Sequence, residues 1–493
     1  MTTLDLKDAY FLIRIHVDHR KYLRFNPLGK LYEFNVLPFG LNSAPFVFTK
    51  IMKPVVSLLR SCGYISTIYL DDILLVSYSY SECLQNIHDT TIFLEALGFI
   101  VNTEKSNPFP SNSCKFLGFI INSTSLEVSL PQKKINKLKS ELNKFFKMSR
   151  CKIRDFARLV GLLTSACPAV EYGWLYTKEL ERCKYLNLLH DDNYDNYMNI
   201  PPSVLPDLQW WYRALDKPIN KIKQNYFCLE IYSDSSTTGW GVACGEERAS
   251  GIWSHSERSY HINYLELLAA FFGLKIFAKS YRNCQILLRI DNTTAISYIN
   301  RMGGVQFPHL TKIAKELWQW CEARDIVVFA SYIRSTDNSV ADAESRRVHP
   351  DIEWELSDYA FQKIVHHFGD PQVDIFASRL NRKCDRYISW HRDPDAYAID
   401  AFTVSWSKLF FYGFPPFAVI LKTLRKIIND NASGVLVVPL WTTQPWYPLF
   451  RSLLVSEPII FKPNTNLIIS HSSNRDIHQR ITLVAGILSK RPS

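Results

Sequence analysis

The fold of the first part of this chain follows from one stretch of sequence, Tyr64-Ile65-Ser66-Thr67-Ile68-Tyr69-Leu70-Asp71-Asp72-Ile73-Leu74-Leu75-Val76-Ser77. Two apolar, β-prone runs flank a short acidic step, which predicts a β-hairpin with Asp71 and Asp72 at its tip. Adjacent carboxylates repel each other unless a cation lies between them. Magnesium is the usual cation for oxygen ligands, with phosphate oxygens in the remaining positions. The alternative is a solvated turn that happens to contain two aspartates.

A third carboxylate, Asp5, lies upstream of this hairpin. Leu4 and Leu6 flank it, a pattern typical of a strand end whose acid points into a site. Asp5 is therefore a candidate third ligand for the same cation.

Five motifs follow one another along the first part of the chain, and together they resemble the palm motifs of a reverse transcriptase. They are Asp5 with Tyr10; Leu37-Pro38-Phe39-Gly40-Leu41-Asn42-Ser43-Ala44-Pro45; Tyr69-Leu70-Asp71-Asp72; Leu97-Gly98-Phe99 with Lys105; and Cys114-Lys115-Phe116-Leu117-Gly118-Phe119. Five motifs in family order are a specific signal. The resemblance implies that residues 1–125 form a polymerase palm, an antiparallel sheet with helices.

The resemblance also implies a role for each motif in DNA synthesis. Two magnesium ions would activate the primer 3′-hydroxyl and stabilise the leaving pyrophosphate. The implied roles are metal binding by Asp5, Asp71, Asp72 and the Leu6 carbonyl, exclusion of a 2′-hydroxyl by Tyr10, contact below the template-paired base by Phe39 and Gly40, protonation of pyrophosphate by Lys105, and a primer grip formed by Phe116, Leu117 and Gly118.

Some of these residues have a simpler interpretation. Tyr10 is also compatible with a buried aromatic at a strand end, and Lys105 with a surface ion pair. Only four residues precede Asp5, so the fingers segment that grips the triphosphate in the family is largely missing, and we expect an N-terminally truncated fragment. Residues 19–25 read as a basic strand with interleaved aromatics, either part of the fingers or an ordinary amphipathic strand.

The bulk composition describes a globular chain with an anionic partner. Apolar residues make up 47% and charged residues 21% of the 493 positions, which excludes a disordered protein. The net charge of +10 suits nucleic acid. The 11 cysteines form no Cys-x-x-Cys pair, which argues for a reducing compartment inside the cell, the cytoplasm, the nucleus or both. No signal peptide or membrane-spanning stretch is apparent, so no membrane partner is expected.

Residues 126–225 predict a mainly helical segment. Ile135, Leu138 and Leu142 lie on one helix face with lysines opposite, and residues 153–163 repeat the amphipathic pattern. The position in the chain favours a thumb and connection that contact a duplex backbone, whereas the pattern alone also fits any solvated helical bundle.

Residues 226–347 carry a second set of acids, one on each of four predicted elements. Asp234 and Asp291 end strands, Glu266 lies among apolar residues at the start of a helix, and Asp342 lies one turn into a last helix, where it is expected to face inward. A glutamate among apolar neighbours is costly unless it is paired or bound to metal. The alternative is four unrelated surface acids.

The order Asp, Glu, Asp, Asp resembles a ribonuclease H domain of the retroelement type, a mixed α/β fold. The resemblance implies two magnesium ions held by Asp234, Glu266, Asp291 and Asp342, and cleavage of the RNA strand of an RNA–DNA hybrid. Where many members of this family carry a histidine before the last acid, this chain has Tyr332. A phenol does not transfer protons near neutral pH as imidazole does, so slower turnover is expected.

Residues 350–456 predict a further α/β unit, and residues 457–493 a tail. Val373-Asp374-Ile375-Phe376-Ala377, Phe414-Pro415-Pro416-Phe417 and the apolar strand 434–441 resemble the degenerate adenine-methyltransferase-like domain of DIRS-type retrotransposons. Alternatively, Phe414 and Phe417 are core aromatics.

We therefore predict an α/β and α+β multidomain chain from the pol polyprotein of a DIRS-like retroelement, an RNA-directed DNA polymerase with ribonuclease H activity. The expected partners are an RNA template, a DNA primer, dNTPs and the RNA–DNA hybrid, with two magnesium ions in each active site. A non-catalytic nucleic-acid-binding remnant of such an element is the alternative, and a free-standing DNA adenine methyltransferase depends on the C-terminal region alone.

Overall fold

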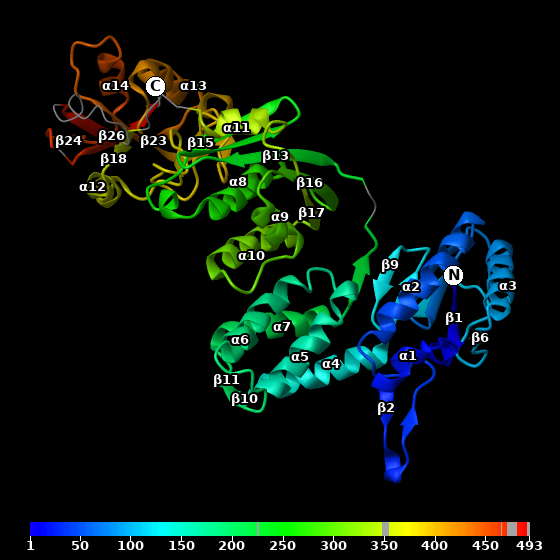
Figure 1. Ribbon diagram of the computed structural model, residues 1–493. Coiled ribbons are helices and arrows are strands. Elements are labelled where there is room, and N and C mark those ends of the chain that lie inside the picture. Colours follow the sequence, from blue (N-terminus) through cyan, green and yellow to red (C-terminus); the bar gives the residue numbers. More distant parts are fainter. Residues whose placement is uncertain (224–225, 348–353, 465, 471–480, 491–493) are drawn as a thin grey trace. The chain divides into compact units, whose positions relative to one another are not determined.

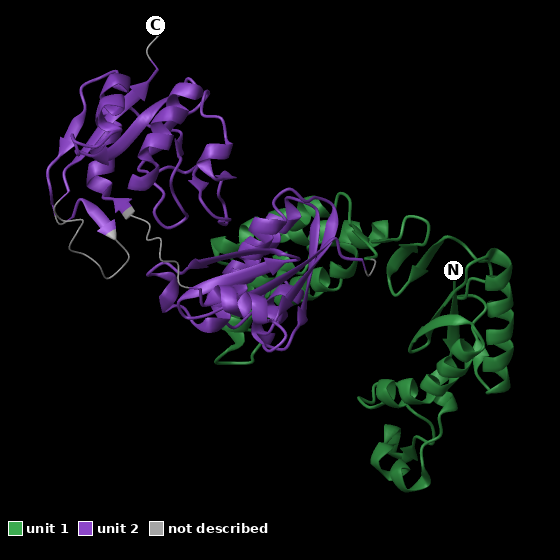
Figure 2. Cartoon of the chain, turned by 90° about the horizontal axis from the view of Figure 1, so that it is seen from above, with its two compact units in different colours: residues 1–225 green, residues 226–493 purple. Residues whose placement is uncertain are grey.

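A computed structural model of the chain describes residues 1–223, 226–347, 354–464, 466–470 and 481–490. The chain divides into two units, residues 1–225 and residues 226–493 (Figure 2). Both units mix helices and sheets, so the predicted α/β and α+β fold class is confirmed.

The acidic hairpin forms as predicted, from strands β4 (Ile65–Tyr69) and β5 (Asp72–Val76). These strands belong to an antiparallel sheet in the order β4-β5-β1-β6, with β1 at Thr2–Lys7 and β6 at Ile100–Val101. Side chains alternate between the two faces of a strand. Leu4 and Leu6 of β1 are therefore buried on one face, and Asp5 lies on the other.

Two helices cover the apolar face of this sheet, α2 (Ala44–Ser61) and α3 (Tyr80–Ala96) (Figure 1). Phe48 and Met52 of α2 and Leu94 of α3 share one core with Leu4 and Ile73 of the sheet. Both helices therefore lie on the face of the sheet opposite Asp5.

The rest of the first unit is a second sheet followed by a helical region, in agreement with the mainly helical prediction for residues 126–225. The sheet has the order β12-β9-β8-β7. The elements are β7 (Ser113–Phe116), β8 (Phe119–Asn122), β9 (Glu127–Ser129), α4 (Gln132–Phe145), β10 (Arg150–Lys152), α5 (Ile153–Thr164), α6 (Lys178–Leu188), β11 (Tyr197–Asn199), α7 (Leu205–Ala214) and β12 (Ile219–Lys221).

Residues 19–25, predicted as a basic strand, form a different structure. Helix α1 (Val17–Arg20) and a 3-10 turn (Lys21–Leu23) come first, and only Arg24–Phe25 is extended, as strand β2. Its partner β3 (Tyr32–Glu33) is equally short. The strand prediction was wrong because only two residues have a neighbouring strand to bond, and helical turns satisfy the backbone of the others.

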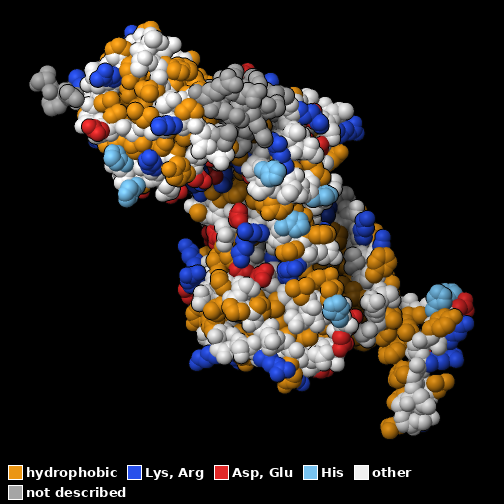
Figure 3. Space-filling model, turned by 90° about the vertical axis from the view of Figure 1, so that its left-hand side faces the viewer, with side chains coloured by type: hydrophobic (Ala, Val, Ile, Leu, Met, Phe, Trp, Pro, Cys, Tyr) orange, Lys and Arg blue, Asp and Glu red, His pale blue; other side chains and the backbone are white. Residues whose placement is uncertain are grey.

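The β2–β3 hairpin carries apolar side chains that the described chain leaves uncovered. Phe25 is 43% exposed, Leu28 104%, Leu31 68% and Tyr32 49%. Figure 3 shows apolar side chains along this projecting hairpin, at the lower right. Several exposed apolar side chains on one hairpin are typical of an interaction site.

The middle domain, residues 226–347, is a five-stranded mixed sheet in the order β15-β14-β13-β16-β17. Strands β13, β16 and β17 are parallel, and β14 and β15 are antiparallel to their neighbours. The strands are β13 (Leu229–Ser235), β14 (Gly239–Cys244), β15 (Glu247–Ile252), β16 (Cys284–Ile290) and β17 (Ile326–Tyr332). The predicted mixed α/β architecture is therefore present.

Four helices complete the middle domain: α8 (Ile262–Phe277), α9 (Thr293–Asn300), α10 (Pro308–Glu322) and α11 (Ser339–Ser345). Helix α8 is apolar on nearly all sides and buried along most of its length, as a central helix must be. Its early residues include Glu266, so the fold places a carboxylate inside the domain.

The C-terminal domain, residues 354–490, is a sheet between two helical layers. Its order is β19-β22-β23-β26-β24. Val435 and Val437 of β23 pack with α12, and Leu436 and Val438 pack with α13 and α14 on the opposite face. The elements are β18 (Trp354–Leu356), α12 (Asp358–Phe368), β19 (Val373–Asp374), β20 (Ile388–Ser389), β21 (Ala398–Ile399), β22 (Phe410–Gly413), α13 (Ile420–Asn429), β23 (Ser433–Pro439), α14 (Tyr447–Leu453), β24 (Ile459–Phe461), β25 (Ile468–Ser470) and β26 (Leu483–Ser489).

The predicted tail, residues 457–493, is not a tail. Strand β26 pairs antiparallel with β23 over seven positions and with β24 on its other side. It is buried because it occupies an interior place in the sheet. The boundary predicted at residue 456 was therefore wrong, since no local pattern marked Leu483–Ser489 as the partner of a strand more than 40 residues upstream.

Candidate active sites

The first candidate site is the tip of the β4–β5 hairpin and the strand beside it. Tyr69 pairs with Asp72, so Leu70 and Asp71 form a two-residue turn. Leu70 has a φ of +54°, a conformation that is strained for a branched side chain and is often retained at functional sites. The Leu6 N–H donates to the Asp71 carbonyl over 2.9 Å, and Asp5 lies opposite Asp72 in the β1–β5 register.

The three acids of this site affect one another electrostatically. Burial, together with Asp5 and Asp72, raises the pKa of Asp71. Burial and Asp5 likewise raise the pKa of Asp72. Lys105 opposes both shifts, and its Nζ lies 3.8 Å from Asp5 Oδ1. Such a site favours a cation because a positive charge would remove the repulsion.

The other residues predicted for this site lie around the hairpin. Leu6 is buried, and Tyr10 is buried with its ring 5.3 Å from that of Phe39 and 4.9 Å from that of Phe48. Phe39 itself is 59% exposed. Gly40 has a φ of +91°, which glycine adopts readily.

The predicted primer grip is the turn of a second hairpin. Phe116 ends β7 and is buried, while Leu117 and Gly118 have φ angles of +48° and +78° and connect it to β8. Two consecutive positive φ angles are typical of the tight turns that join antiparallel strands. The strands place Leu117 at the tip, where it is 42% exposed.

The second candidate site lies in the middle domain. Asp234 near the end of β13, Glu266 in α8 and Asp291 directly after β16 each offer one carboxylate oxygen, and these oxygens lie within 4.8 Å of one another. Among the described residues this is the one group of three potential metal ligands that are so close. Parallel β13 and β16 bring Asp234 and Asp291 together, since their carboxyl ends meet at one edge of the sheet.

Burial dominates the electrostatics of this second site. It raises the pKa of Glu266 to about 9, with added repulsion from Asp234 and Asp291. Burial also raises the pKa of Asp234 to about 6, although the Ser345 hydroxyl donates to its Oδ2 over 2.7 Å. A cation at this position would lower the pKa of both acids and so favour their charged forms.

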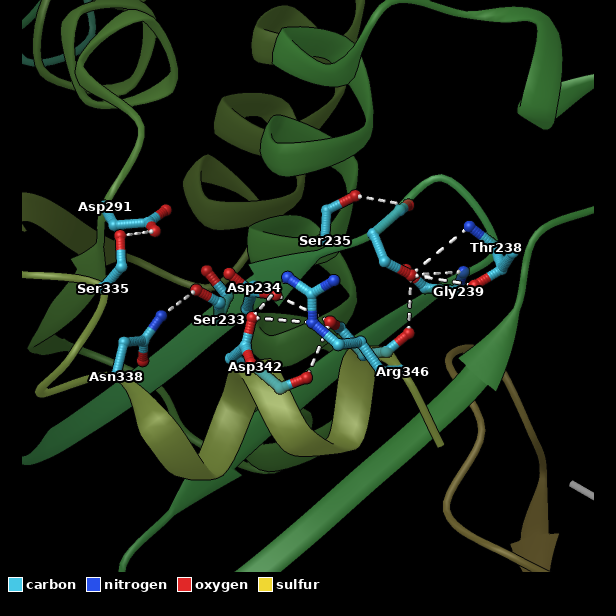
Figure 4. Close-up of polar contacts among 12 residues, drawn as sticks. Ser233, Asp234, Ser235, Thr238, Gly239, Asp291, Ser335, Asn338, Asp342 and Arg346 are labelled. Carbon is cyan, nitrogen blue, oxygen red and sulfur yellow. Dashed lines mark hydrogen bonds and ion pairs between the residues drawn. The ribbon is translucent and has the colours of Figure 1, made fainter. Parts of the chain in front are cut away.

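Asp342, the fourth predicted acid, lies beside this group but is bound differently. Its Oδ1 accepts hydrogen bonds from Arg346 Nε at 3.0 Å and Arg346 Nη2 at 2.7 Å (Figure 4). Its side chain is 39% exposed rather than facing fully inward. Asp342 nevertheless contributes to the raised pKa of Asp234.

Several supporting residues were missed by the sequence analysis. Ser335 donates to Asp291 Oδ2 over 2.7 Å, Ser345 donates to Asp234, and Ser106 Oγ accepts the Asp5 N–H over 2.9 Å. Arg346 lies four positions after Asp342, the spacing at which helical side chains meet, so the Arg346–Asp342 pair could have been found from the sequence. Ser345, Ser335 and Ser106 reach their acids only through the tertiary fold.

Each of the two sites has a buried carboxylate oxygen that a bound cation could satisfy. Asp71 Oδ1 and Glu266 Oε2 are buried and accept no hydrogen bond from the described residues. A buried carboxylate oxygen without a donor is costly, and a divalent cation would satisfy it. The residues present therefore fit oxygen-ligated metal ions in both places.

Tyr332 ends β17 and is 55% exposed. The C-terminal domain has a buried acid, Asp374, but Phe414 at the head of its Phe-Pro-Pro-Phe segment is buried within the core. Across the described parts of the chain, none of the helices combines the length and apolarity needed to cross a membrane.

The sequence around the first candidate site matches a known protein family. Residues 1–121 match the family described as "Reverse transcriptase (RNA-dependent DNA polymerase)". The enzymatic polyprotein of Cauliflower mosaic virus (strain CM-1841) is 26% identical over 360 residues, which cover 70% of this chain and 50% of the polyprotein. The Pol polyprotein of the Drosophila melanogaster transposon gypsy is 24% identical over 464 residues, covering 87% of this chain and 41% of the polyprotein.

A solved structure of the foamy viral protease-reverse transcriptase in complex with an RNA/DNA hybrid is 19% identical, with a TM-score of 0.41, covering 67% of this chain and 43% of that one. The chain spans about half the length of the curated relatives it matches or less. The hairpin acids fall within the region that the family match covers. Over residues 1–121 this chain therefore carries a reverse transcriptase domain of the kind found in retroelement pol polyproteins.

Proposed function

We propose that this chain is the polymerase and ribonuclease H part of a retroelement polyprotein, and that it synthesises DNA on an RNA template and degrades the RNA of the resulting hybrid. The observation that carries the proposal is the pairing of Asp5 with Asp72 beside the strained Leu70–Asp71 turn, within the region that matches the reverse transcriptase family. The eleven free cysteines support a reducing intracellular location, in cytoplasm or nucleus.

In DNA synthesis, Asp5, Asp71 and Asp72 would hold two magnesium ions between the primer terminus and the triphosphate. Magnesium, when bound, lowers the pKa of an attacking hydroxyl or water and neutralises charge on the phosphate. The buried Tyr10 ring, packed against Phe39 and Phe48, is a rigid wall that would exclude a 2′-hydroxyl. Lys105 would donate a proton to the departing pyrophosphate. We assign the template contact to Phe39 and Gly40 and the primer grip to Phe116, Leu117 and Gly118.

In RNA cleavage, Asp234, Glu266 and Asp291 would hold the metal ions, with Asp342 completing the set. Ser345 and Ser335 orient Asp234 and Asp291 through hydrogen bonds. Arg346 donates both of its hydrogen bonds to Asp342 Oδ1, so Oδ2 is the oxygen through which Asp342 would bind a metal ion. The substrate would be an RNA–DNA hybrid, whose RNA strand is recognised by its 2′-hydroxyls.

The test of the proposal is one incubation of the whole chain with a labelled primer on an RNA template, dNTPs and Mg²⁺. We expect a lengthened primer and a shortened template, loss of both with EDTA, and recovery of both on adding excess Mg²⁺. Binding of the hybrid without either reaction would contradict the proposal.

That outcome would instead support a second candidate function, a non-catalytic nucleic-acid-binding remnant. Two observations favour it. The Arg346 guanidinium already pairs with the Asp342 carboxylate. Tyr332 stands where ribonuclease H sites of related elements have a histidine.

We further propose that the chain belongs to a DIRS-like element and that the C-terminal domain derives from an adenine methyltransferase. The Phe-Pro-Pro-Phe segment directly follows β22 at the carboxyl edge of three parallel strands, the edge at which α/β sheets bind ligands. An adenine methyltransferase needs a polar acceptor at the head of this motif, and Phe414 has none.

The C-terminal domain is therefore expected not to methylate DNA. Incubating the whole chain with adenine-containing DNA and labelled S-adenosylmethionine should transfer no label above a blank without protein. Phe414→Asp should not create activity, because position 414 is buried in the core rather than open to a base. Label in the DNA would show that the domain is an active enzyme.

A further inference from the structure

Buried polar groups of the C-terminal domain shape residues 378–396, a mostly irregular segment that includes the short strand β20 and that we call the docking segment. Asp374 is an acid at the end of a strand, a position that makes it a candidate catalytic residue. Its side chain is buried, with 3% of the residue exposed. Its Oδ1 accepts the Phe376 N–H at 3.3 Å and its Oδ2 accepts the Lys383 N–H at 3.0 Å. The first bond holds backbone just before the docking segment and the second holds backbone within it, so Asp374 has a structural role.

A second carboxylate, Asp393, lies near the other end of the docking segment and binds residues at its start and middle. Asp393 Oδ2 accepts the Arg379 N–H at 3.0 Å, and its Oδ1 accepts the Tyr387 hydroxyl at 2.7 Å. Asp393 thus fixes the backbone of Arg379, which leaves the Arg379 side chain free to extend away from its own domain.

The Arg379 side chain enters the middle domain. Its Nη1 and Nη2 each donate to one carboxylate oxygen of Glu257 at 2.9 Å, and Nη2 also donates to the Ile252 carbonyl at 2.8 Å. The guanidinium lies 4.8 Å from the Phe272 ring centroid. The Arg379 and Glu257 side chains are only 15% and 18% exposed. A two-pronged, largely desolvated arginine pair of this kind is geometrically specific.

Three further contacts join the same two surfaces. Lys275 Nζ lies 2.8 Å from Asp395 Oδ2, and Lys279 Nζ donates to the Ala396 carbonyl over 2.5 Å. Arg392 pairs with Glu247. On the middle domain these contacts fall on strand β15, the edge of the sheet, and on helix α8 and the residues just after it. Helix α8 carries both Phe272 and Glu266.

From these contacts we propose that the docking segment holds helix α8 in place and that Arg379 is a positioning residue for Glu266. The proposal gives the C-terminal domain a function other than chemistry: it is an internal partner of the middle domain. The part that concerns cleavage rests on the proposed ribonuclease H function, whereas the part that concerns α8 does not.

The lowered pKa of Glu257 agrees with its ion pair to Arg379. Burial alone would raise the pKa of this carboxyl, but the hydrogen bonds and charge of Arg379 hold it below its usual value. Removal of Arg379 would leave a buried, unpaired carboxylate, which is strongly destabilising. Replacement of Glu257 by glutamine in the same chain would relieve that cost and would keep an acceptor for the Ser254 N–H, now bonded over 2.7 Å.

The test is hydrogen–deuterium exchange of the whole chain, read by mass spectrometry on peptides from α8. We expect Arg379→Met to speed exchange in α8 on the order of tenfold, and Arg379→Met with Glu257→Gln to be slower than Arg379→Met alone. The matched control is Arg386→Met, the same change in the same segment, because Arg386 lies on the Tyr397 ring within its own domain. That control should leave α8 unchanged.

Unchanged α8 exchange in Arg379→Met would overturn the proposal, and so would an equal effect from Arg386→Met. Exchange is measured without substrate, so it decides the question even if the chain proves to have no nuclease activity. If it does cleave RNA, Arg379→Met should raise the Mg²⁺ concentration needed for half-maximal rate, and the double variant should lower it again.

Discussion

Asp71→Asn is expected to abolish primer extension, with a loss on the order of a thousandfold or more, equivalent to roughly 4 kcal/mol of transition-state stabilisation. The reason is that Asp71 Oδ1, beside Asp5 and Asp72, is buried and accepts no hydrogen bond from the residues that the structure describes. An amide keeps the shape of the turn but lacks the charge that draws a divalent cation. Extension of a labelled primer on an RNA template measures the loss.

Asp18→Asn is the matched control, since the same change falls on an aspartate whose side chain is 79% exposed on helix α1. It should leave extension unchanged. Calorimetric titration with Mn²⁺ adds a readout that needs no turnover, and Asp71→Asn should weaken that binding. Robust extension by Asp71→Asn would contradict the assignment of the first site.

Glu266→Gln is expected to abolish cleavage of a labelled RNA–DNA hybrid, again on the order of a thousandfold. Glu266 offers an oxygen within 4.8 Å of those of Asp234 and Asp291, and its buried Oε2 accepts no hydrogen bond in the described part of the chain, so an amide here removes a charged ligand from the group. Hybrid binding should persist, because a neutral residue inside the domain changes no surface charge. Cleavage at the rate of the wild-type chain would show that the second site lies elsewhere.

Glu246→Gln is the control for this change, because Glu246 is exposed at the turn between β14 and β15. A stability measurement adds an independent readout. In metal-free buffer the folded protein holds the Glu266 proton up to a pKa of about 9, against 4.5 as the ordinary value. Stability should therefore fall as pH rises from about 5 to about 9. Glu266→Gln removes this contribution, so its thermal midpoint should depend less on pH in that window.

Much of the first unit follows from local pattern. The alternation around Tyr69-Leu70-Asp71-Asp72 predicts the hairpin because side chains on one face of a strand must be apolar to reach the core. The spacing of Ile135, Leu138 and Leu142 predicts helix α4, because residues three and four positions apart lie on the one helix face that must be apolar to reach the core. The strand-end acids Asp234 and Asp291 converge because β13 and β16 are parallel neighbours, a pairing that the motif order made foreseeable.

Elements that depend on distant partners could not be predicted in this way. Residues 19–25 look extended in sequence, yet only a two-residue partner strand exists for them. Strand β26 joins the C-terminal sheet only because β23 and β24 present free edges to it. Asp342 was expected to face inward with the other acids, but Arg346 one turn further on the helix competes for its charge.

The sequence by itself determined which residues carry charge at strand ends and turns, and hence the identity of both carboxylate sets. It did so because the spacing of apolar residues dictates which side chains can be buried and where each strand stops. The tertiary structure alone decided which of those charges meet and which are already paired. Arg379 and Glu257 are more than 120 residues apart, and no local pattern links them. Their ion pair exists because the fold of the second unit brings a desolvated guanidinium and a desolvated carboxylate to the same point.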